Sequence, residues 1–173
     1  MNGCTKTLLT SATAVMLLAS PAWAQSGSFD GSNRAAASAE TNLNVTCGAQ
    51  TGNLIRTENG LTNFNSTAFA TLPGSGVTVT VPAGTSRCVK ALFTAEAGAT
   101  AFCYVRAVAN GVPLLPDGGG FQALVSNDST AGGHAFEWVR RLATGTYTIS
   151  MQARVSSGTC GIDDWTFDVE VHS

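Results

Sequence analysis

Ionisable side chains are scarce in this sequence. Lysine, arginine, aspartate and glutamate together make up 12% of the 173 residues, and histidine occurs only twice. The formal net charge is −2, and no run of basic residues occurs along the chain. A nucleic-acid-binding protein needs a basic patch or stripe that matches the phosphates. We therefore expect no nucleic acid partner.

Sequence motifs for catalysis and metal binding are also missing. The chain has no G-x-S-x-G nucleophile elbow, no C-x-x-C pair, no phosphate loop and no D-x-[DN]-x-[DN]-G calcium loop. We therefore predict no cofactor, no metal site and no catalytic residue. Residues whose oxygen atoms could bind calcium do occur in segments predicted as loops, namely Asp117, Asn127, Asp128, Asp163 and Asp164. The preference of Asp and Asn for turns explains their presence there better than a calcium site does.

The N-terminus has the layout of a secretory signal peptide. Lys6 precedes an uncharged apolar run over 8–18, and a small-residue A-x-A pattern ends at Ala24. The run is too short to span a membrane, which takes roughly 20 residues, and no long apolar run follows it. We predict a signal peptide over 1–24, a flexible lead-in over 25–41 and a single domain over 42–173. The expected location is secreted, either extracellular or periplasmic.

Four of the five cysteines lie after the predicted cleavage site. An even number of cysteines in an exported chain indicates disulfides rather than a metal or redox site. We therefore expect two disulfides among Cys47, Cys88, Cys103 and Cys160.

The rest of the chain is typical of β-structure. Short alternating apolar runs are separated by glycine, proline, asparagine and aspartate, and no stretch after the signal peptide has a helical period. About eight short strands in some 130 residues predict one antiparallel β-sandwich of the jelly-roll kind. The clearest runs are 77–81, 86–95, 101–109, 121–125, 135–142, 147–155 and 165–171.

Strand parity suggests two hairpins. Residues that face each other in an antiparallel pair lie on the same side of the sheet. We expect 147–155 to pair with 165–171, with Met151 opposite Phe167 or Val169.

The same reasoning pairs 86–95 with 101–109 and places Cys88 and Cys103 on opposite faces. A disulfide needs the two Cβ atoms within about 4.5 Å, so we exclude a bond between this pair. Two connectivities remain open. We favour Cys47–Cys88 with Cys103–Cys160.

Several short segments resemble small exported bacterial β-sandwich domains of unknown function and, more distantly, the C1q/TNF-like jelly rolls. The similar segments are Phe93–Glu96, Tyr104–Arg106 with Gly111–Val112, Gly145–Ile149 and Asp163–Trp165. The resemblance extends from about Thr78 to Val171. A C1q-like domain implies a trimer that binds ligands, although this chain lacks a Gly-X-Y stem. The resemblance assigns no functional residue.

Two arginines and one tryptophan are the candidate ligand-binding residues. Arg106 shares strand parity with Tyr104, and Arg140 shares it with Trp138. A guanidinium beside an aromatic ring can clamp a carboxylate or another anion, and an exposed indole can stack on a sugar. The structural alternatives are arginines that snorkel at a sheet edge and a tryptophan packed in the core.

The sequence favours a secreted, non-enzymatic binding or structural domain whose ligand it does not identify. As a binding module, the domain would use the loops 112–120 and 126–133 or the surface around Trp138 and Arg140. Carbohydrate is one possible partner, and self-association of a cell-surface or pilus-type protein is another. A carbohydrate-active hydrolase would instead require Glu96, Glu137 or His134 to converge in a cleft.

Overall fold

The computed structural model describes residues 45–116, 124–126 and 129–173. The predicted signal peptide and lead-in lie outside these residues. The described residues form strands joined by turns and contain no helix. None of them therefore forms a helix able to span a membrane. The prediction of an all-β antiparallel sandwich is confirmed.

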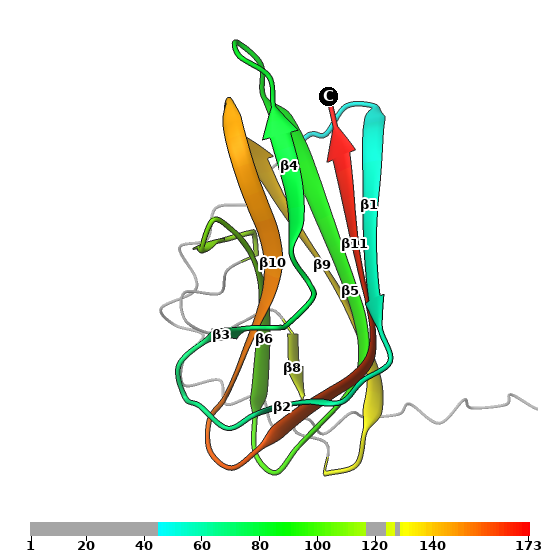
Figure 1. Ribbon diagram of the computed structural model, residues 1–173, viewed down its shortest axis with the longest axis vertical. Coiled ribbons are helices and arrows are strands. Elements are labelled where there is room, and N and C mark those ends of the chain that lie inside the picture. The colour runs from blue at the N-terminus through cyan, green and yellow to red at the C-terminus, as the bar shows by residue number, and fades with distance from the viewer. Residues whose placement is uncertain (1–44, 117–123, 127–128) are drawn as a thin grey trace, which may run out of the picture. The chain divides into compact units, whose positions relative to one another are not determined.

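The strands form two antiparallel sheets, which we call sheet I and sheet II (Figure 1). Sheet I has the order β1-β11-β5-β9, and the short strand β2 also pairs with β11. Its strands are β1 (Gln50–Glu58), β2 (Thr62–Phe64), β5 (Arg87–Ala99), β9 (Gly132–Leu142) and β11 (Cys160–His172).

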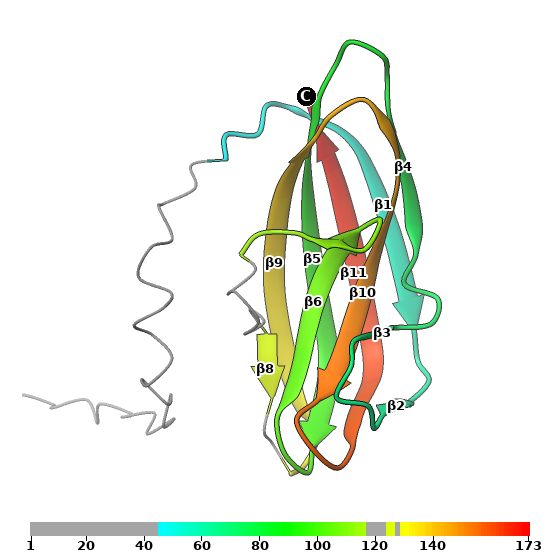
Figure 2. The same ribbon diagram turned by 90° about the vertical axis from the view of Figure 1, so that its left-hand side faces the viewer.

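Sheet II has the order β3-β10-β6-β7, with β4 also paired to β10 and β8 also paired to β6. Figure 2 shows this sheet in front of sheet I. Its strands are β3 (Ala70–Thr71), β4 (Val77–Val81), β6 (Cys103–Ala109), β7 (Val112–Pro113), β8 (Leu124–Ser126) and β10 (Gly145–Val155).

Most of the strands predicted from alternation are present, and several are longer than expected. The run 77–81 is β4 with unchanged bounds, and its side chains alternate between buried and exposed. Strand β1 was not predicted, and all nine of its residues are exposed. An edge strand of this kind buries no apolar set and therefore leaves no alternation in the sequence.

Both predicted hairpins are wrong. Strand β10 pairs with β3, β4 and β6 in sheet II, whereas β11 pairs with β1, β2 and β5 in sheet I. The strands β5 and β6 are likewise divided between the sheets. In both cases the chain arches from one sheet to the other. The apolar side chains of the two strands then meet across the core. Strand parity is the same for this arrangement and for two strands paired side by side in one sheet, so it cannot distinguish them.

The favoured disulfide connectivity is confirmed as Cys47–Cys88 and Cys103–Cys160. The second bond joins β6 of sheet II to β11 of sheet I, and both of its cysteines are fully buried. The first bond ties the segment before β1 to the outward-facing side of β5. Cys88 and Cys103 are indeed unbonded to each other, because Cys88 faces outward from sheet I whereas Cys103 faces the core from sheet II.

The two sheets contribute differently to the core. Sheet I supplies the large aromatic rings, and sheet II supplies smaller aliphatic side chains that fill the space between them. The buried aromatics of sheet I include Phe93, Trp138, Trp165 and Phe167, and the residues opposite them include Val79, Val105, Ala107, Ile149, Met151 and Ala153.

Candidate ligand-binding pocket between the sheets

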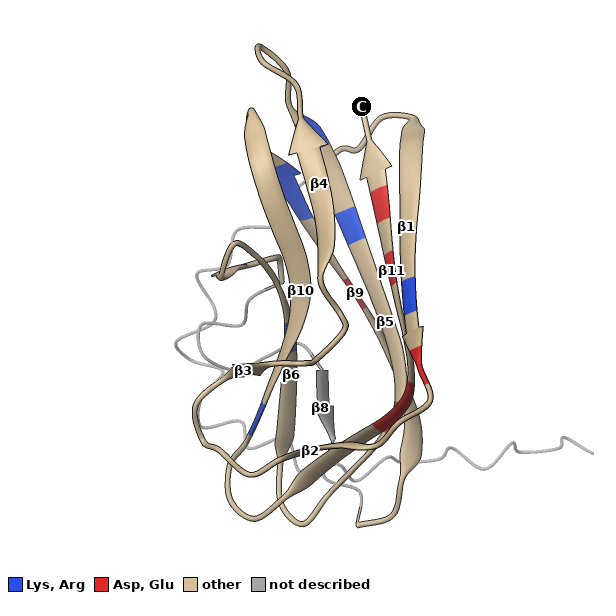
Figure 3. Cartoon of the chain, viewed as in Figure 1, with Lys and Arg blue, Asp and Glu red and all other residues tan. Residues whose placement is uncertain are grey.

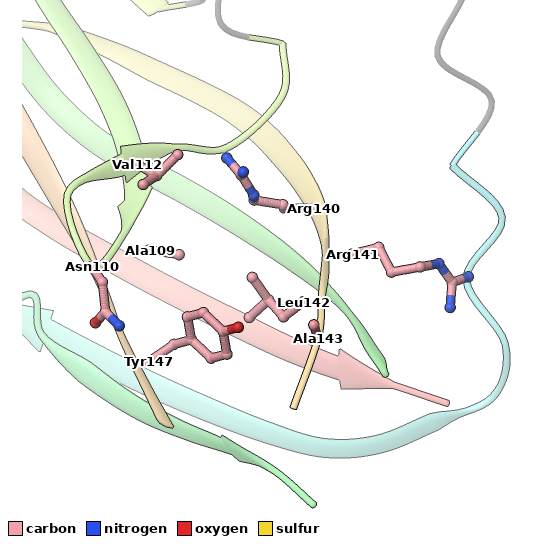
Figure 4. Close-up of a pocket in the computed structure, with 8 residues that line it drawn as sticks. All are labelled: Ala109, Asn110, Val112, Arg140, Arg141, Leu142, Ala143 and Tyr147. Carbon is pink, nitrogen blue, oxygen red and sulfur yellow. The ribbon is translucent and has the colours of Figure 1, made fainter. Parts of the chain in front are cut away.

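A pocket of about 290 Å³ opens between the sheets where β9 of sheet I approaches β6, β7 and β10 of sheet II (Figure 4). Four of its eight lining residues are apolar, and the other four carry polar groups. The residues that line it are Ala109, Asn110, Val112, Arg140, Arg141, Leu142, Ala143 and Tyr147. Ligand pockets have volumes of about 300–1,000 Å³, so this pocket lies at the small end of the range. This one would suit a small ligand.

One wall of the pocket is a tight turn between β6 and β7. Asn110 and Gly111 both have positive φ values, 48° and 80°, as a two-residue hairpin turn requires. The Asn110 amide donates to the carbonyl of Thr146 and accepts from the backbone N–H of Thr148. These bonds fix the turn against β10. The wall is therefore rigid, and Asn110 shapes the pocket more than it offers groups to a ligand.

Arg140 supplies the positive charge of the pocket. It occupies an inward-facing position of β9, opposite the buried Val89 of β5. Its guanidinium extends toward Val112 at the pocket wall, as Figure 4 shows, and Nη1 donates to the carbonyl of Pro113. Within the described residues, this is the only side-chain hydrogen bond of Arg140. One bond orients the guanidinium while most of its five N–H donors face the pocket and solvent.

Tyr147 and Leu142 form the opposite side of the pocket. The tyrosine ring packs over Gly145, where an added Cβ would lie 3.4 Å from the ring, and its hydroxyl points toward Leu142 (Figure 4). Leu142 is buried at 3% exposure and gives the pocket an apolar floor. The phenol therefore adds a polar group beside an apolar surface, which suits a ligand that has one apolar and one polar end.

The charge of the pocket has one sign. None of the described residues that line it is acidic. Arg141 points away from the pocket and instead donates to Ser86 and to the carbonyl of Thr46, which precedes the first disulfide. Among the residues that line the pocket, Arg140 is thus the one charged side chain directed into it. Such a pocket favours an anion over a cation or a neutral molecule.

The structure does not bring the three predicted ligand-binding residues together. Trp138 lies in the core at 1% exposure, against the ring of Phe136. Its indole is therefore covered, in agreement with the core-packing alternative. Arg106 lies on the outer face of sheet II, and only Arg140 lines the pocket. The sequence places an arginine and an aromatic residue on one face, but it does not reveal which face remains accessible.

The residues proposed for a hydrolase do not converge. Glu96 and Glu137 project from the outer face of sheet I, where Glu137 lies 4.0 Å from Lys90. His134 pairs with the buried Ala95 and projects from the opposite face of the same sheet. A sheet therefore separates the histidine from both carboxylates. Glu137 pairs with Leu92, four residues from Glu96, so the two carboxylates lie about 13 Å apart along the strands, beyond the roughly 5–10 Å of a glycosidase pair.

Residues 117–120 and 127–128 of the two loops proposed for binding lie outside the described residues. The same holds for the possible calcium ligands Asp117, Asn127 and Asp128. The other two, Asp163 and Asp164, lie on β11 at an irregularity of the strand rather than in a loop. No cluster of potential metal ligands occurs among the described residues.

Sequence reasoning missed Tyr147 and Asn110 as pocket residues. Tyr147 belongs to the apolar set of its strand, and this pattern does not distinguish a pocket residue from a core residue. The Asn110-Gly111 pair correctly indicates a turn. However, no local signal reveals that the core stays open beside that turn, because the opening depends on how far β9 lies from β6.

No protein-family model matches the sequence, and no curated protein matches it. Among solved structures, the chain is similar to dimeric latent PorU from Porphyromonas gingivalis, at 11% sequence identity and a TM-score of 0.32. The match covers 75% of this chain and 14% of that chain. A similarity this low identifies neither a family nor a function. The fold therefore defines the protein only as an all-β sandwich domain.

Proposed function

We propose that this protein is an exported, non-enzymatic binding domain whose inter-sheet pocket holds a small ligand with a carboxylate group. One observation carries the proposal: Arg140 directs a guanidinium into a pocket of about 290 Å³ that no described acidic residue lines. A planar guanidinium binds a carboxylate through two parallel hydrogen bonds. The apolar floor at Leu142 would hold the rest of the ligand, and the Tyr147 hydroxyl would bond a second polar atom.

Export has two supports that are independent of the pocket. The first is the charge, hydropathy and A-x-A pattern of residues 1–24. The second is the pair of disulfides, since such bonds persist in oxidising compartments and are rare in the cytosol. The domain would therefore meet its ligand in the periplasm or outside the cell.

The strand order supports a jelly-roll assignment. Counting β1, β4, β5, β6, β8, β9, β10 and β11 as strands one to eight gives the orders 1-8-3-6 and 2-7-4-5 in the two sheets. Each sheet thus pairs strands that are distant in sequence, as two nested Greek keys do. A C1q/TNF-like relationship remains a proposal that this order supports.

The proposal is tested by titrating the disulfide-bonded protein with benzoate, followed by NMR chemical shifts. Benzyl alcohol is the matched neutral probe, because it has the same ring without the charge. We expect benzoate to bind more tightly and to shift the signals of Tyr147, Leu142 and Arg140. Arg140→Gln should weaken benzoate binding about tenfold or more, the cost of one charge-assisted hydrogen bond.

Arg140→Lys is the matched control variant, because it keeps the charge but loses the planar fork. It should retain part of the affinity if the guanidinium acts as a bidentate clamp. The proposal is wrong if benzoate and benzyl alcohol bind equally, or if the shifted signals lie away from the pocket.

A further inference from the structure

The described residues include two Asn-Gly pairs, which lie in contrasting surroundings. Asn59-Gly60 lies between β1, which ends at Glu58, and β2, which begins at Thr62. Asn110-Gly111 forms the tight turn between β6 and β7. A third pair, Asn2-Gly3, belongs to the predicted signal peptide and lies outside the described residues. The same dipeptide therefore occurs in this domain once in an open connection and once in a fixed turn.

An Asn-Gly pair can lose ammonia without an enzyme. The backbone nitrogen of the glycine forms a bond to Cγ of the asparagine, which closes a succinimide ring. The side-chain nitrogen takes up the proton from the backbone nitrogen and leaves as ammonia. Water then opens the ring to give aspartate or isoaspartate. Glycine favours the ring closure, because it has no Cβ to crowd the nitrogen or to restrict the backbone. The reaction also needs a side-chain amide that can turn toward the next nitrogen.

The fold holds the amide of Asn110 away from this reaction. Its Nδ2 donates to the carbonyl of Thr146 at 3.1 Å, and its Oδ1 accepts from the backbone N–H of Thr148 at 2.8 Å. Both bonds direct the amide toward β10. The backbone N–H of Asn110 also donates to the carbonyl of Thr148 at 2.9 Å, which fixes the turn itself. Cγ of Asn110 can reach the nitrogen of Gly111 only after these side-chain bonds break.

Asn59 has no such restraint on its side chain. Asn59, Gly60 and Leu61 are all exposed, and they connect β1 to β2 without belonging to either strand. The backbone N–H of Asn59 donates to Glu58 Oε1 at 3.2 Å. Within residues 45–116, 124–126 and 129–173, no group bonds the side-chain amide of Asn59 or the backbone nitrogen of Gly60. The two groups that must react are therefore able to meet in the folded protein.

This contrast predicts different reaction rates for the two pairs. A group held by native hydrogen bonds reacts only from the fraction of molecules in which its surroundings have opened. Two hydrogen bonds must break at Asn110 and none at the side chain of Asn59, which predicts a difference of at least about tenfold. In the unfolded chain this difference should disappear, because both asparagines are then followed by an unrestrained glycine.

We propose that Asn59 is a site of spontaneous deamidation in the folded protein and that its turn protects Asn110 from the same reaction. Conversion of Asn59 adds a carboxylate next to Glu58 and, as isoaspartate, lengthens the backbone between β1 and β2. Asn110 lines the pocket, so its protection preserves the pocket wall. This inference does not depend on the proposed pocket ligand.

The test follows both sites in the full disulfide-bonded protein during incubation at mildly alkaline pH. Samples are digested at intervals, and mass spectrometry measures the fraction of aspartate and isoaspartate in the peptide that carries each asparagine. We expect Asn59 to react at least about tenfold faster than Asn110. Equal rates at the two sites, or a faster reaction at Asn110, would overturn the proposal.

The same measurement on the reduced protein in urea separates the effect of the fold from that of the sequence. There the two rates should agree within about threefold, because neither site retains its native surroundings. The rate at Asn59 should also change by less than about threefold between the folded and the unfolded protein. If folding slows Asn59 by about tenfold or more, the connection between β1 and β2 is itself protected and the proposal is wrong.

One variant tests the chemistry at Asn59. Gly60 does not have a positive φ, and an added Cβ would meet only the Glu58 side chain, with Oε1 at 3.4 Å, so Gly60→Ala is compatible with the fold. It should slow the reaction at Asn59 by about tenfold or more, because the methyl group crowds the attacking nitrogen. Gly133→Ala is the matched control, since its added Cβ meets nothing within 4 Å, and it should leave the rate unchanged. An unchanged rate in Gly60→Ala would show that Asn59 does not react through the succinimide.

Discussion

The two sheets of this sandwich are built in different ways. Sheet I consists mainly of strands of nine to thirteen residues that pair along most of their length. Sheet II has two longer strands, β6 of seven residues and β10 of eleven, and is completed by β3, β4, β7 and β8, which are two to five residues long. Sheet I also carries the large rings of the core, whereas sheet II packs smaller side chains against them.

This difference shows that long and short strands are held in register in two different ways. Long strands with a buried aromatic set hold their register, because a slip of one residue would expose every ring. Short strands bury too little to do so and depend on particular side chains at their ends. In sheet II, Ser75 and Asn110 bond the connecting segments to β10. The pocket lies beside these short pieces, at the turn between β6 and β7.

The largest expected effect is the loss of a ring from sheet I. Phe167→Ala removes a fully buried ring at the centre of β11 and should lower the free energy of unfolding by about 3–5 kcal/mol. Val105→Ala in sheet II removes fewer atoms and should cost about 2 kcal/mol. Chemical denaturation measures both. Equal costs would show that the core does not depend more strongly on sheet I.

The next largest effect is the loss of stability when a disulfide is removed, and it should differ between the two disulfides. Their cysteines are separated by 57 and 41 residues, so loop entropy alone would make Cys103–Cys160 more stabilising by only about 0.3 kcal/mol. We expect Cys103→Ala with Cys160→Ala to cost about 2–5 kcal/mol, because it unlinks the sheets and leaves a buried cavity.

Cys47→Ala with Cys88→Ala should cost less, because Cys47 is partly exposed and the bond ties down only the segment before β1. Thermal and denaturant unfolding of both double variants would measure the difference. If the free energies of unfolding of the two double variants differ by no more than about 0.3 kcal/mol, chain entropy accounts for the difference in stabilisation and the link between the sheets does not.

A smaller effect is expected at Ser75, which joins the segment before β4 to β10. Its hydroxyl donates to the carbonyl of Leu72 and accepts from the backbone N–H of Met151, and it is fully buried. Ser75→Ala would leave that N–H without its partner, at a cost of about 1–3 kcal/mol. Ser86→Ala is the control, since the bond from Arg141 to Ser86 is exposed, and should cost less than about 0.5 kcal/mol. If the two variants have equal stability, the hydroxyl of Ser75 does not hold the short strands in place.

The smallest effect is expected on the outer face of sheet I. Lys90 and Glu137 lie 4.0 Å apart with side chains 37% and 54% exposed. Glu137→Gln should change stability by about 0.5 kcal/mol or less, and the change should vanish at about 1 M salt. Unfolding curves at low and high salt measure this. A larger loss that persists at high salt would show that this face contributes more to the fold than a solvated surface does.

The amino-acid sequence determined the class of fold and most of the strands. Alternation in 77–81 placed β4 with its observed bounds, and the turn pair Asn110-Gly111 marked the end of β6, because both signals are local. Four cysteines after a signal-peptide pattern predicted the two disulfides. The edge strand β1 was missed because its exposed side chains bury no apolar set.

Only the tertiary structure decided which sheet each strand joins. The parity of β10 and β11 is the same whether the strands pair in one sheet or face each other across the core, so the sequence favoured a hairpin that does not form. The tertiary structure also decided which of Arg106, Trp138 and Arg140 remain accessible to solvent. Parity assigns each of these side chains to a face of its strand, but whether a second layer covers that face depends on residues far away in the sequence.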